Sequence, residues 1–178
     1  MSETWPRGCV QLYTGNGKGK TTAALGLALR AAGHGLRTYV GQFLKSAPSG
    51  ERAAAAALGG LVTIETYGSG TFMPPGKKLD PAEVERARDG LARAREAMLS
   101  GSYQIVVLDE INVAVHFGLL AVKDVLAVIQ EKPEGLELVL TGYGAPPPLI
   151  DAADLVSVVK AVKHYFDKGV KARPGIEL

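Results

Sequence analysis

Cysteine is nearly absent from this chain, since Cys9 is the only one among 178 residues. An internal disulfide is therefore impossible, which excludes disulfide-stabilised folds and fits a reducing compartment. Long hydrophobic runs are also missing, because no apolar stretch approaches the ~20 residues that span a bilayer. Residues 1–8 contain no apolar segment of the kind that a secretory signal needs. We therefore expect a cytoplasmic protein that does not associate with a membrane.

An excess of charge of one sign is lacking as well. Lys and Arg number 20 against 18 Asp and Glu, so the formal net charge is only +2. This balance gives no basis for binding nucleic acid or an anionic membrane through overall charge. The histidines, His34, His116 and His164, are scattered and lack metal-ligand spacing. Any anion must therefore be recognised by locally placed groups.

Short β-rich runs alternate with longer helical stretches along the chain. This pattern predicts an α/β fold with a mainly parallel sheet and helices on both faces. We expect strands at residues 10–13, 37–43, 61–67, 105–108, 136–141 and 155–162. We expect helices at residues 20–32, 51–58, 81–99 (capped by Asp80), 119–130 and 147–153. The length suits a single domain over residues 1–178, with a short N-terminal extension at 1–8 and an irregular C-terminal tail at 167–178.

A glycine-rich segment follows the first expected strand and opens the first expected helix. It consists of Thr14, Gly15, Asn16, Gly17, Lys18, Gly19, Lys20, Thr21 and Thr22. This order is typical of a P-loop, in which backbone N–H groups and a helix N-terminus surround a phosphate. Lys20 would neutralise phosphate charge and the Thr21 hydroxyl would ligate Mg²⁺. Thr14 stands where a P-loop usually has its first glycine, and the alternative is a glycine-rich turn with incidental lysines.

Two acids, Asp109 and Glu110, follow the buried-looking strand at 105–108. Acids at the carboxyl end of a strand lie in the crevice where open α/β sheets bind ligands. Mg²⁺ prefers hard oxygen ligands and keeps several waters, so one of these acids can hold it directly or through water. The alternative is an acid that caps the strand end, but the neighbouring P-loop favours metal binding.

These segments and others resemble one family along nearly the whole chain. The matching segments are TGNGKGKTT at 14–22, RAAGHG at 30–35, QFLK at 42–45 followed by Gly50 and Glu51, VLDE at 107–110, TGYG at 141–144, DAAD at 151–154, VKH at 162–164 and GIE at 175–177. In this order and spacing they resemble the ATP:corrinoid adenosyltransferases. The resemblance implies a P-loop NTPase-like (RecA-like) fold.

The resemblance also implies a reaction, in which a Co(I) corrinoid attacks the 5′ carbon of ATP and triphosphate leaves. This is a step of cobalamin biosynthesis or salvage, and ATP would lie along the loop in the reverse of its usual direction. Lys18, Lys20, Mg²⁺ and the loop amides would stabilise the departing triphosphate. Reduced cobalt is itself the nucleophile, so no catalytic triad is needed. A homodimer and a reduced flavin or flavoprotein as electron donor are further implications.

The resemblance assigns site residues as well. Arg30 joins the glycine-rich segment as an ATP-binding residue. The implied corrinoid-binding residues are Gln42, Lys45, Phe72, Met73, Lys163 and His164.

The chain departs from the family pattern in four places. In the run at 70–73 only Phe72 supplies a ring, where the family has an aromatic GFxW-like stretch under the corrin. Tyr143 stands where arginine is common, and Val158 stands where glutamate is frequent. The N-terminal extension that many members place over the active site is almost absent. An ordinary P-loop phosphotransferase or ATPase, and a non-catalytic ATP or corrinoid carrier, stay open as alternatives.

Overall fold

A parallel sheet of six strands forms the centre of the protein, whose computed structural model describes residues 7–46, 49–70 and 79–177. The strands are β1 (Val10–Thr14), β2 (Thr38–Phe43), β3 (Val62–Tyr67), β4 (Ile105–Asp109), β5 (Glu137–Thr141) and β6 (Leu155–Val158). Their spatial order is β3-β2-β4-β5-β1-β6, and every neighbouring pair is parallel. All strands therefore end at one edge of the sheet, where ligands bind in folds of this type.

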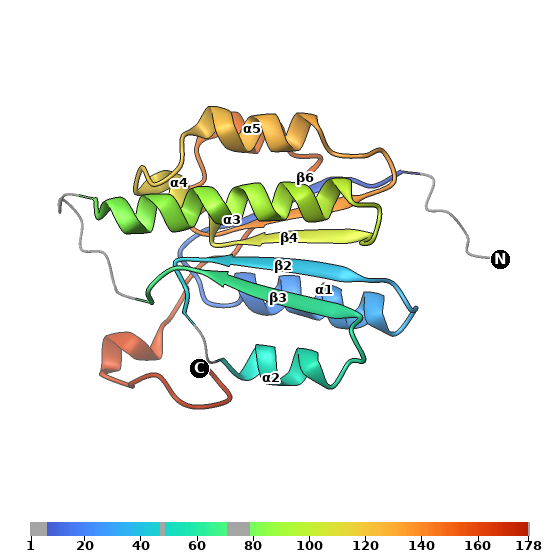
Figure 1. Cartoon of the computed structure of the whole chain (residues 1–178). Coiled ribbons are helices and arrows are strands. Elements are labelled where there is room, and N and C mark those ends of the chain that lie inside the picture. Colours follow the sequence, from blue (N-terminus) through green and yellow to red (C-terminus); the bar gives the residue numbers. More distant parts are fainter. Residues whose placement is uncertain (1–6, 47–48, 71–78, 178) are drawn as a thin grey trace.

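Helices cover both faces of the sheet, as predicted (Figure 1). One face carries α1 (Lys20–Ala32) and α2 (Gly50–Ala56). The other carries α3 (Pro81–Leu99), α4 (Ile111–His116), α5 (Val122–Gln130) and α6 (Pro147–Asp151). No helix of the described residues is long and apolar enough to cross a membrane.

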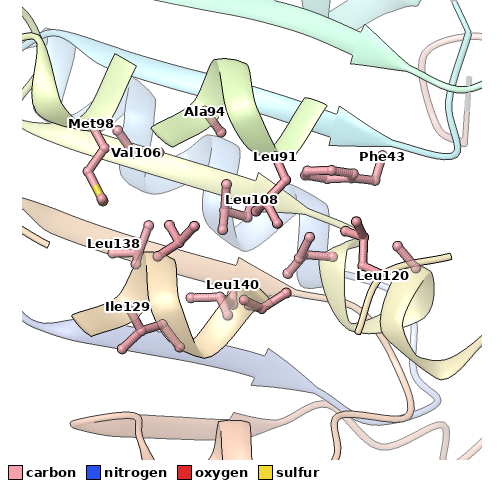
Figure 2. Close-up of a cluster of buried hydrophobic side chains, with 14 of the residues drawn as sticks. Phe43, Leu91, Ala94, Met98, Val106, Leu108, Leu120, Ile129, Leu138 and Leu140 are labelled. Atoms are coloured by element: carbon pink, nitrogen blue, oxygen red, sulfur yellow. The ribbon is translucent and has the colours of Figure 1, made fainter. Parts of the chain in front are cut away.

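Two hydrophobic cores lie on opposite faces because strand side chains alternate in direction. Val106 and Leu108 of β4 pack with Leu91 of α3, whereas Ile105 and Val107 belong to the core beneath α1. Figure 2 shows the first core, with side chains of α3, β4, β5 and α5 meeting above the sheet. The continuous apolar run of β4 thus reflects burial on both faces.

Local signals explain the best-predicted helices. Asp80 caps α3 through its side chain, which accepts from the Ala82 N–H at 2.9 Å, and Pro81 takes the first helical position. Helix α1 runs from Lys20 to Ala32 as predicted, between Gly19 with φ 124° and Gly33 at its C-cap.

The structure corrects several predicted boundaries and adds one helix. The helix expected at 119–130 begins only at Val122, and the preceding segment contains the unpredicted α4. All five residues from Ile111 to Val115 are buried, so α4 lacks the one-sided apolar pattern by which a helix is recognised. Strand β6 ends at Val158 instead of 162, because it pairs only with β1, whose last residue Thr14 lies opposite Val158.

The predicted irregular tail also contains regular structure. A short 3₁₀ helix spans Tyr165–Lys168, begins at the His164 side chain and ends at Gly169 with φ 75°. Beyond it, Arg173 pairs with Glu177 at 3.1 Å. The tail is therefore held by its own polar contacts.

Helix α3 approaches β3 so closely at Gly90 that a side chain there would collide with Tyr67. A Cβ at Gly90 would lie 2.6 Å from Tyr67 Cγ, and the Tyr67 hydroxyl is fixed by Tyr39 at 2.7 Å and by Glu65. We expect Gly90→Ala to lower the free energy of unfolding by about 1–3 kcal/mol through overpacking, although alanine favours a helix. Urea denaturation measures this effect.

The control is Asp89→Ala, which changes the exposed neighbouring position. It should leave the free energy of unfolding within about 0.5 kcal/mol of wild type. If Gly90→Ala is as stable as wild type, α3 can move away from Tyr67 without cost.

Candidate functional site

The glycine-rich loop leaves β1 at the carboxyl edge of the sheet and packs against the segment that follows β6. A Cβ at Gly15, whose φ is 99°, would lie 2.3 Å from the Val159 carbonyl oxygen. The Gly17 N–H donates to the same oxygen at 2.9 Å, and the Asn16 side-chain oxygen accepts from Ala161 N–H at 3.1 Å. Glycine is thus required here by close backbone approach as well as by conformation.

Lys20 is the first residue of α1, and its ammonium group spans the loop. Its Nζ donates to the carbonyl oxygens of Gly15 and Gly17, both at 2.8 Å. Burial lowers the pKa of Lys20, while the negative charges of Glu110 and Asp109 act in the opposite direction. A cation is therefore held at the point where the loop would surround a phosphate.

The carboxylate of Asp109, at the end of β4, is wholly buried and accepts hydrogen bonds on both oxygens. Thr21 donates to Oδ1 at 2.9 Å and Thr141 at 2.7 Å. Lys45 donates to Oδ2 at 2.7 Å and Gln42 at 3.1 Å. These four donors leave Asp109 little capacity for a direct metal bond. Thr21 donates its hydrogen to Asp109 and its oxygen accepts a long hydrogen bond from Lys45 at 3.4 Å, so one lone pair stays available for a cation.

Glu110 is placed differently from its neighbour. It adopts a left-handed conformation with φ 64°, and its N–H donates to the Thr141 hydroxyl at 2.9 Å. Its carboxylate faces the loop cavity and receives no hydrogen bond from a described residue. Burial, followed by the charge of Asp109, raises the pKa of Glu110, whereas Lys45 and Lys20 act in the opposite direction. The site thus contains a carboxylate whose charge is best stabilised by an added cation.

A cavity of about 720 Å³ connects these groups. Its wall consists of the loop from Gly17 to Thr22, Lys45 and Glu110 at the sheet edge, part of α2, and the C-terminal segment. The C-terminal segment contributes His164, Ile176 and Glu177, and the Lys18 Nζ donates to the Ile176 carbonyl at 3.0 Å. Sequence reasoning missed this wall apart from His164, because no local pattern links a loop near residue 18 to a segment near 176.

Comparisons with known proteins agree with this geometry. The sequence model of the family described as ATP:corrinoid adenosyltransferase BtuR/CobO/CobP matches residues 6–178. The chain belongs to this family. It is 39% identical to a corrinoid adenosyltransferase of Pseudomonas aeruginosa over 96% of this chain and 84% of the relative. It is 37% identical to one of Escherichia coli, over 96% of this chain and 86% of the relative.

Solved structures support the P-loop fold alone. A KaiC-like protein of Pyrococcus horikoshii aligns with a TM-score of 0.57 at 18% identity, over 88% of this chain and 73% of that one. The flagellar accessory protein FlaH of Methanocaldococcus jannaschii aligns with a TM-score of 0.55 at 12% identity, over 86% and 71%. The predicted fold and the predicted family are both confirmed.

The structure of this family member gathers most of the predicted site residues. The loop from Gly17 to Thr22, Lys45, Glu110 and His164 line the cavity, and Gln42 lies buried behind it against Asp109. Thr14, Gly15, Asn16 and Asp109 adjoin residues that line the cavity but do not line it themselves. Two further predicted residues lie farther away. Arg30 is exposed in the last turn of α1, about 15 Å along the helix from Lys20. Lys163 is exposed and does not line the cavity.

The remaining predictions concern aromatic and metal groups. Phe72 and Met73 lie outside the described residues. Tyr143, at the family's arginine position, stacks edge-on against His116 with ring centres 5.1 Å apart.

The described residues contain no group of three or more His, Cys, Asp or Glu side chains that could hold a metal. A divalent ion at Thr21 and Glu110 would thus take its other ligands from phosphate and water, which suits Mg²⁺.

The buried charge of Glu110 gives a pH-dependent prediction. Since its pKa is raised in the folded state, the ionised carboxylate destabilises the fold at neutral pH, and this penalty fades as pH falls through the raised pKa. We expect Glu110→Gln to raise the melting temperature of the ligand-free protein by about 2–4 °C at neutral pH. The difference from wild type should shrink towards acid pH. Calorimetry across a pH series measures it.

Glu85→Gln, on the exposed face of α3, is the matched control. It should change the melting temperature little at any pH. A Glu110→Gln variant that is less stable than wild type at neutral pH would contradict the inferred destabilisation.

Proposed function

We propose that this family member transfers the 5′-deoxyadenosyl group of ATP to the Co(I) centre of a corrinoid, such as cob(I)alamin or cob(I)yrinic acid a,c-diamide. The lone pair of cobalt forms the cobalt–carbon bond, the bond from the 5′ carbon to oxygen breaks, and its electrons leave on triphosphate. The observation that carries this proposal is the meeting of Lys20, Thr21 and Glu110 at one cavity in a chain of this family.

Lys20 and Lys18 act on the leaving group in this proposal. The Lys20 ammonium already lies inside the loop, so a bound phosphate replaces the two carbonyl oxygens that it now contacts. Lys18 would exchange the Ile176 carbonyl for a phosphate oxygen. Both cations then stabilise negative charge that develops on triphosphate as the bond breaks. Thr14 to Thr22 supply the surrounding amides, and Arg30 is at most a distant contributor to ATP binding.

Thr21 and Glu110 would hold Mg²⁺, and Asp109 would orient Thr21 from behind. The free carboxylate of Glu110 and the Thr21 hydroxyl oxygen are hard donors that fit this ion. When bound, Mg²⁺ supplies positive charge beside the phosphates. The saturated hydrogen bonding of Asp109 supports an orienting role over direct ligation.

The corrinoid would approach the carboxyl edge of the sheet near Lys45 and His164, which line the cavity. Gln42 is fully buried, so it would act by positioning Asp109 and not by touching the corrinoid.

Phe72, Met73 and Lys163 stay predictions of the resemblance. The reduced flavin or flavoprotein donor is a further prediction of the resemblance, whereas the single domain and the cytoplasmic location stay predictions from chain length and composition. The exposed apolar residues of the edge strand β6 support the proposed homodimer.

The decisive test is to incubate the protein with Mg-ATP and a chemically reduced Co(I) corrinoid. We expect loss of Co(I) absorbance with matching release of triphosphate. Lys20→Ala should lower kcat by at least ~100-fold, because it removes a preorganised charge from the leaving group. The exposed Lys123→Ala on α5 is the control and should keep wild-type activity.

Other products would contradict the proposal. Release of phosphate or ADP without adenosylcorrinoid would assign the chain to the ordinary P-loop phosphotransferases or ATPases. ATP binding without any reaction would favour a non-catalytic carrier.

A further inference from the structure

The ammonium group of Lys45 lies among the oxygen atoms of the proposed metal site. Its Nζ donates to Asp109 Oδ2 at 2.7 Å and to Thr21 Oγ1 at 3.4 Å. Glu110 is close as well, since the charge of Lys45 opposes the rise in its pKa that burial and Asp109 cause. A positive charge of the chain's own is therefore already present beside the oxygens that a metal ion would use.

The backbone before Lys45 is held in an unfavourable conformation. Leu44 has φ 60°, in the left-handed region that bulky residues rarely adopt. Its N–H donates to the Tyr67 carbonyl at 3.0 Å, and a Cβ at Gly68 would lie 2.6 Å from Leu44 Cα. The neighbouring ends of β2 and β3 thus fix this turn, and with it the point from which the Lys45 side chain starts.

Left-handed backbone at residues other than glycine occurs twice in the described part of the chain, at Leu44 and at Glu110. Leu44 directs Lys45 to the loop cavity, and the conformation of Glu110 directs its own carboxylate there. Strained backbone persists where the surrounding structure enforces it, and it is often concentrated at functional sites. The fold therefore maintains the meeting of this lysine and this carboxylate despite two unfavourable conformations.

The other lysines of the cavity wall are placed differently. Lys20 donates to loop carbonyls, and Lys18 donates to the Ile176 carbonyl. Among the three lysines that line the cavity, Lys45 alone has its described hydrogen bonds to side-chain oxygens of the metal site. Its side chain is 31% exposed, so the ammonium has a path into the cavity.

Two cations at this position would repel each other. A divalent ion on the Thr21 oxygen must lie near the Lys45 ammonium, because that ammonium contacts the same oxygen. The repulsion is strong in a partly buried site, where water and salt screen charges little. Phosphate groups in the loop would give the displaced ammonium new anionic partners. A divalent ion that arrives without phosphate gives it none.

We infer that Lys45 makes metal uptake depend on the nucleotide: its ammonium occupies the cation position in the ligand-free protein and leaves when phosphate groups are bound in the loop. This inference rests on the proposed function insofar as Thr21 and Glu110 are the metal ligands. Lys45 is then a specificity-determining residue of the cation site. The site accepts a divalent ion together with phosphates and excludes the ion alone.

The test measures the affinity for Mn²⁺ without nucleotide, by the electron paramagnetic resonance signal of the free ion. Lys45→Met removes the charge and keeps an unbranched side chain. We expect it to bind Mn²⁺ at least tenfold more tightly than wild type. Lys45→Arg keeps the charge and should stay within threefold of wild type. Lys123→Met, the same change on an exposed part of α5, should equal wild type.

Melting curves give a second readout and verify folding. Lys45→Met loses the cation that pairs with Asp109, so its melting temperature in a chelator should lie below that of wild type. Millimolar Mg²⁺ without nucleotide should raise the melting temperature of Lys45→Met by at least about 2 °C and leave that of wild type unchanged. Wild type should respond to Mg²⁺ only when tripolyphosphate or ATP is also present.

Three outcomes would overturn the inference. Wild type binds Mn²⁺ alone as tightly as Lys45→Met, or its melting temperature rises with Mg²⁺ alone. In the third, Lys45→Arg gains as much affinity as Lys45→Met, which would assign the gain to side-chain shape and not to charge. The wild-type melting curve decides the question even if Lys45→Met does not fold.

Failure of the proposed function gives a different pattern. A Lys45→Met variant that gains Mn²⁺ affinity, in a protein whose wild type forms no adenosylcorrinoid, supports the role of Lys45 and overturns adenosyl transfer. Adenosyl transfer by a wild type that binds Mn²⁺ alone as tightly as Lys45→Met overturns only the role of Lys45.

Discussion

The buried carboxylate of Asp109 joins parts of the chain that are distant in sequence. Its hydrogen-bond donors are Thr21 at the start of α1, Gln42 in β2, Lys45 two residues beyond the end of β2, and Thr141 at the end of β5. A carboxylate without access to water is costly unless it is paired and hydrogen-bonded, so these segments must meet for the sheet edge to form. The position of the phosphate loop relative to the sheet follows from this requirement.

The same arrangement separates the roles of two adjacent acids. Asp109 is satisfied by protein donors, whereas Glu110 turns into a left-handed conformation and faces the cavity without a hydrogen bond from a described residue. One acid therefore stabilises the structure at the sheet edge, and its neighbour is available for a cation. A strand that continued in extended conformation would instead point Glu110 to the opposite face from Asp109.

Sequence patterns predicted those features that depend on local spacing. The glycine-rich loop, helix α1 and the buried strand β4 carry strong signals, and the parallel sheet brings Asp109 to the loop because all strands end at one edge. Helix α4 was missed because its first five residues are all buried, so it lacks a one-sided apolar pattern. The closing of the cavity by the C-terminal segment was also missed, since Lys18 and Ile176 are 158 positions apart. Contacts of this kind depend on the whole topology and leave no trace in a short stretch of sequence.

The Lys20 ammonium, held between the Gly15 and Gly17 carbonyls, has a consequence for the thermodynamics of nucleotide capture. These contacts lie within the protein itself, so folding supplies part of the order that nucleotide binding requires of the loop. Nucleotide binding then replaces two ion–dipole contacts of Lys20 by ion–ion contacts. The free-energy cost of ordering the loop on binding is therefore small. Preorganisation of this kind lets the binding energy of the nucleotide go towards holding the reacting carbon in place.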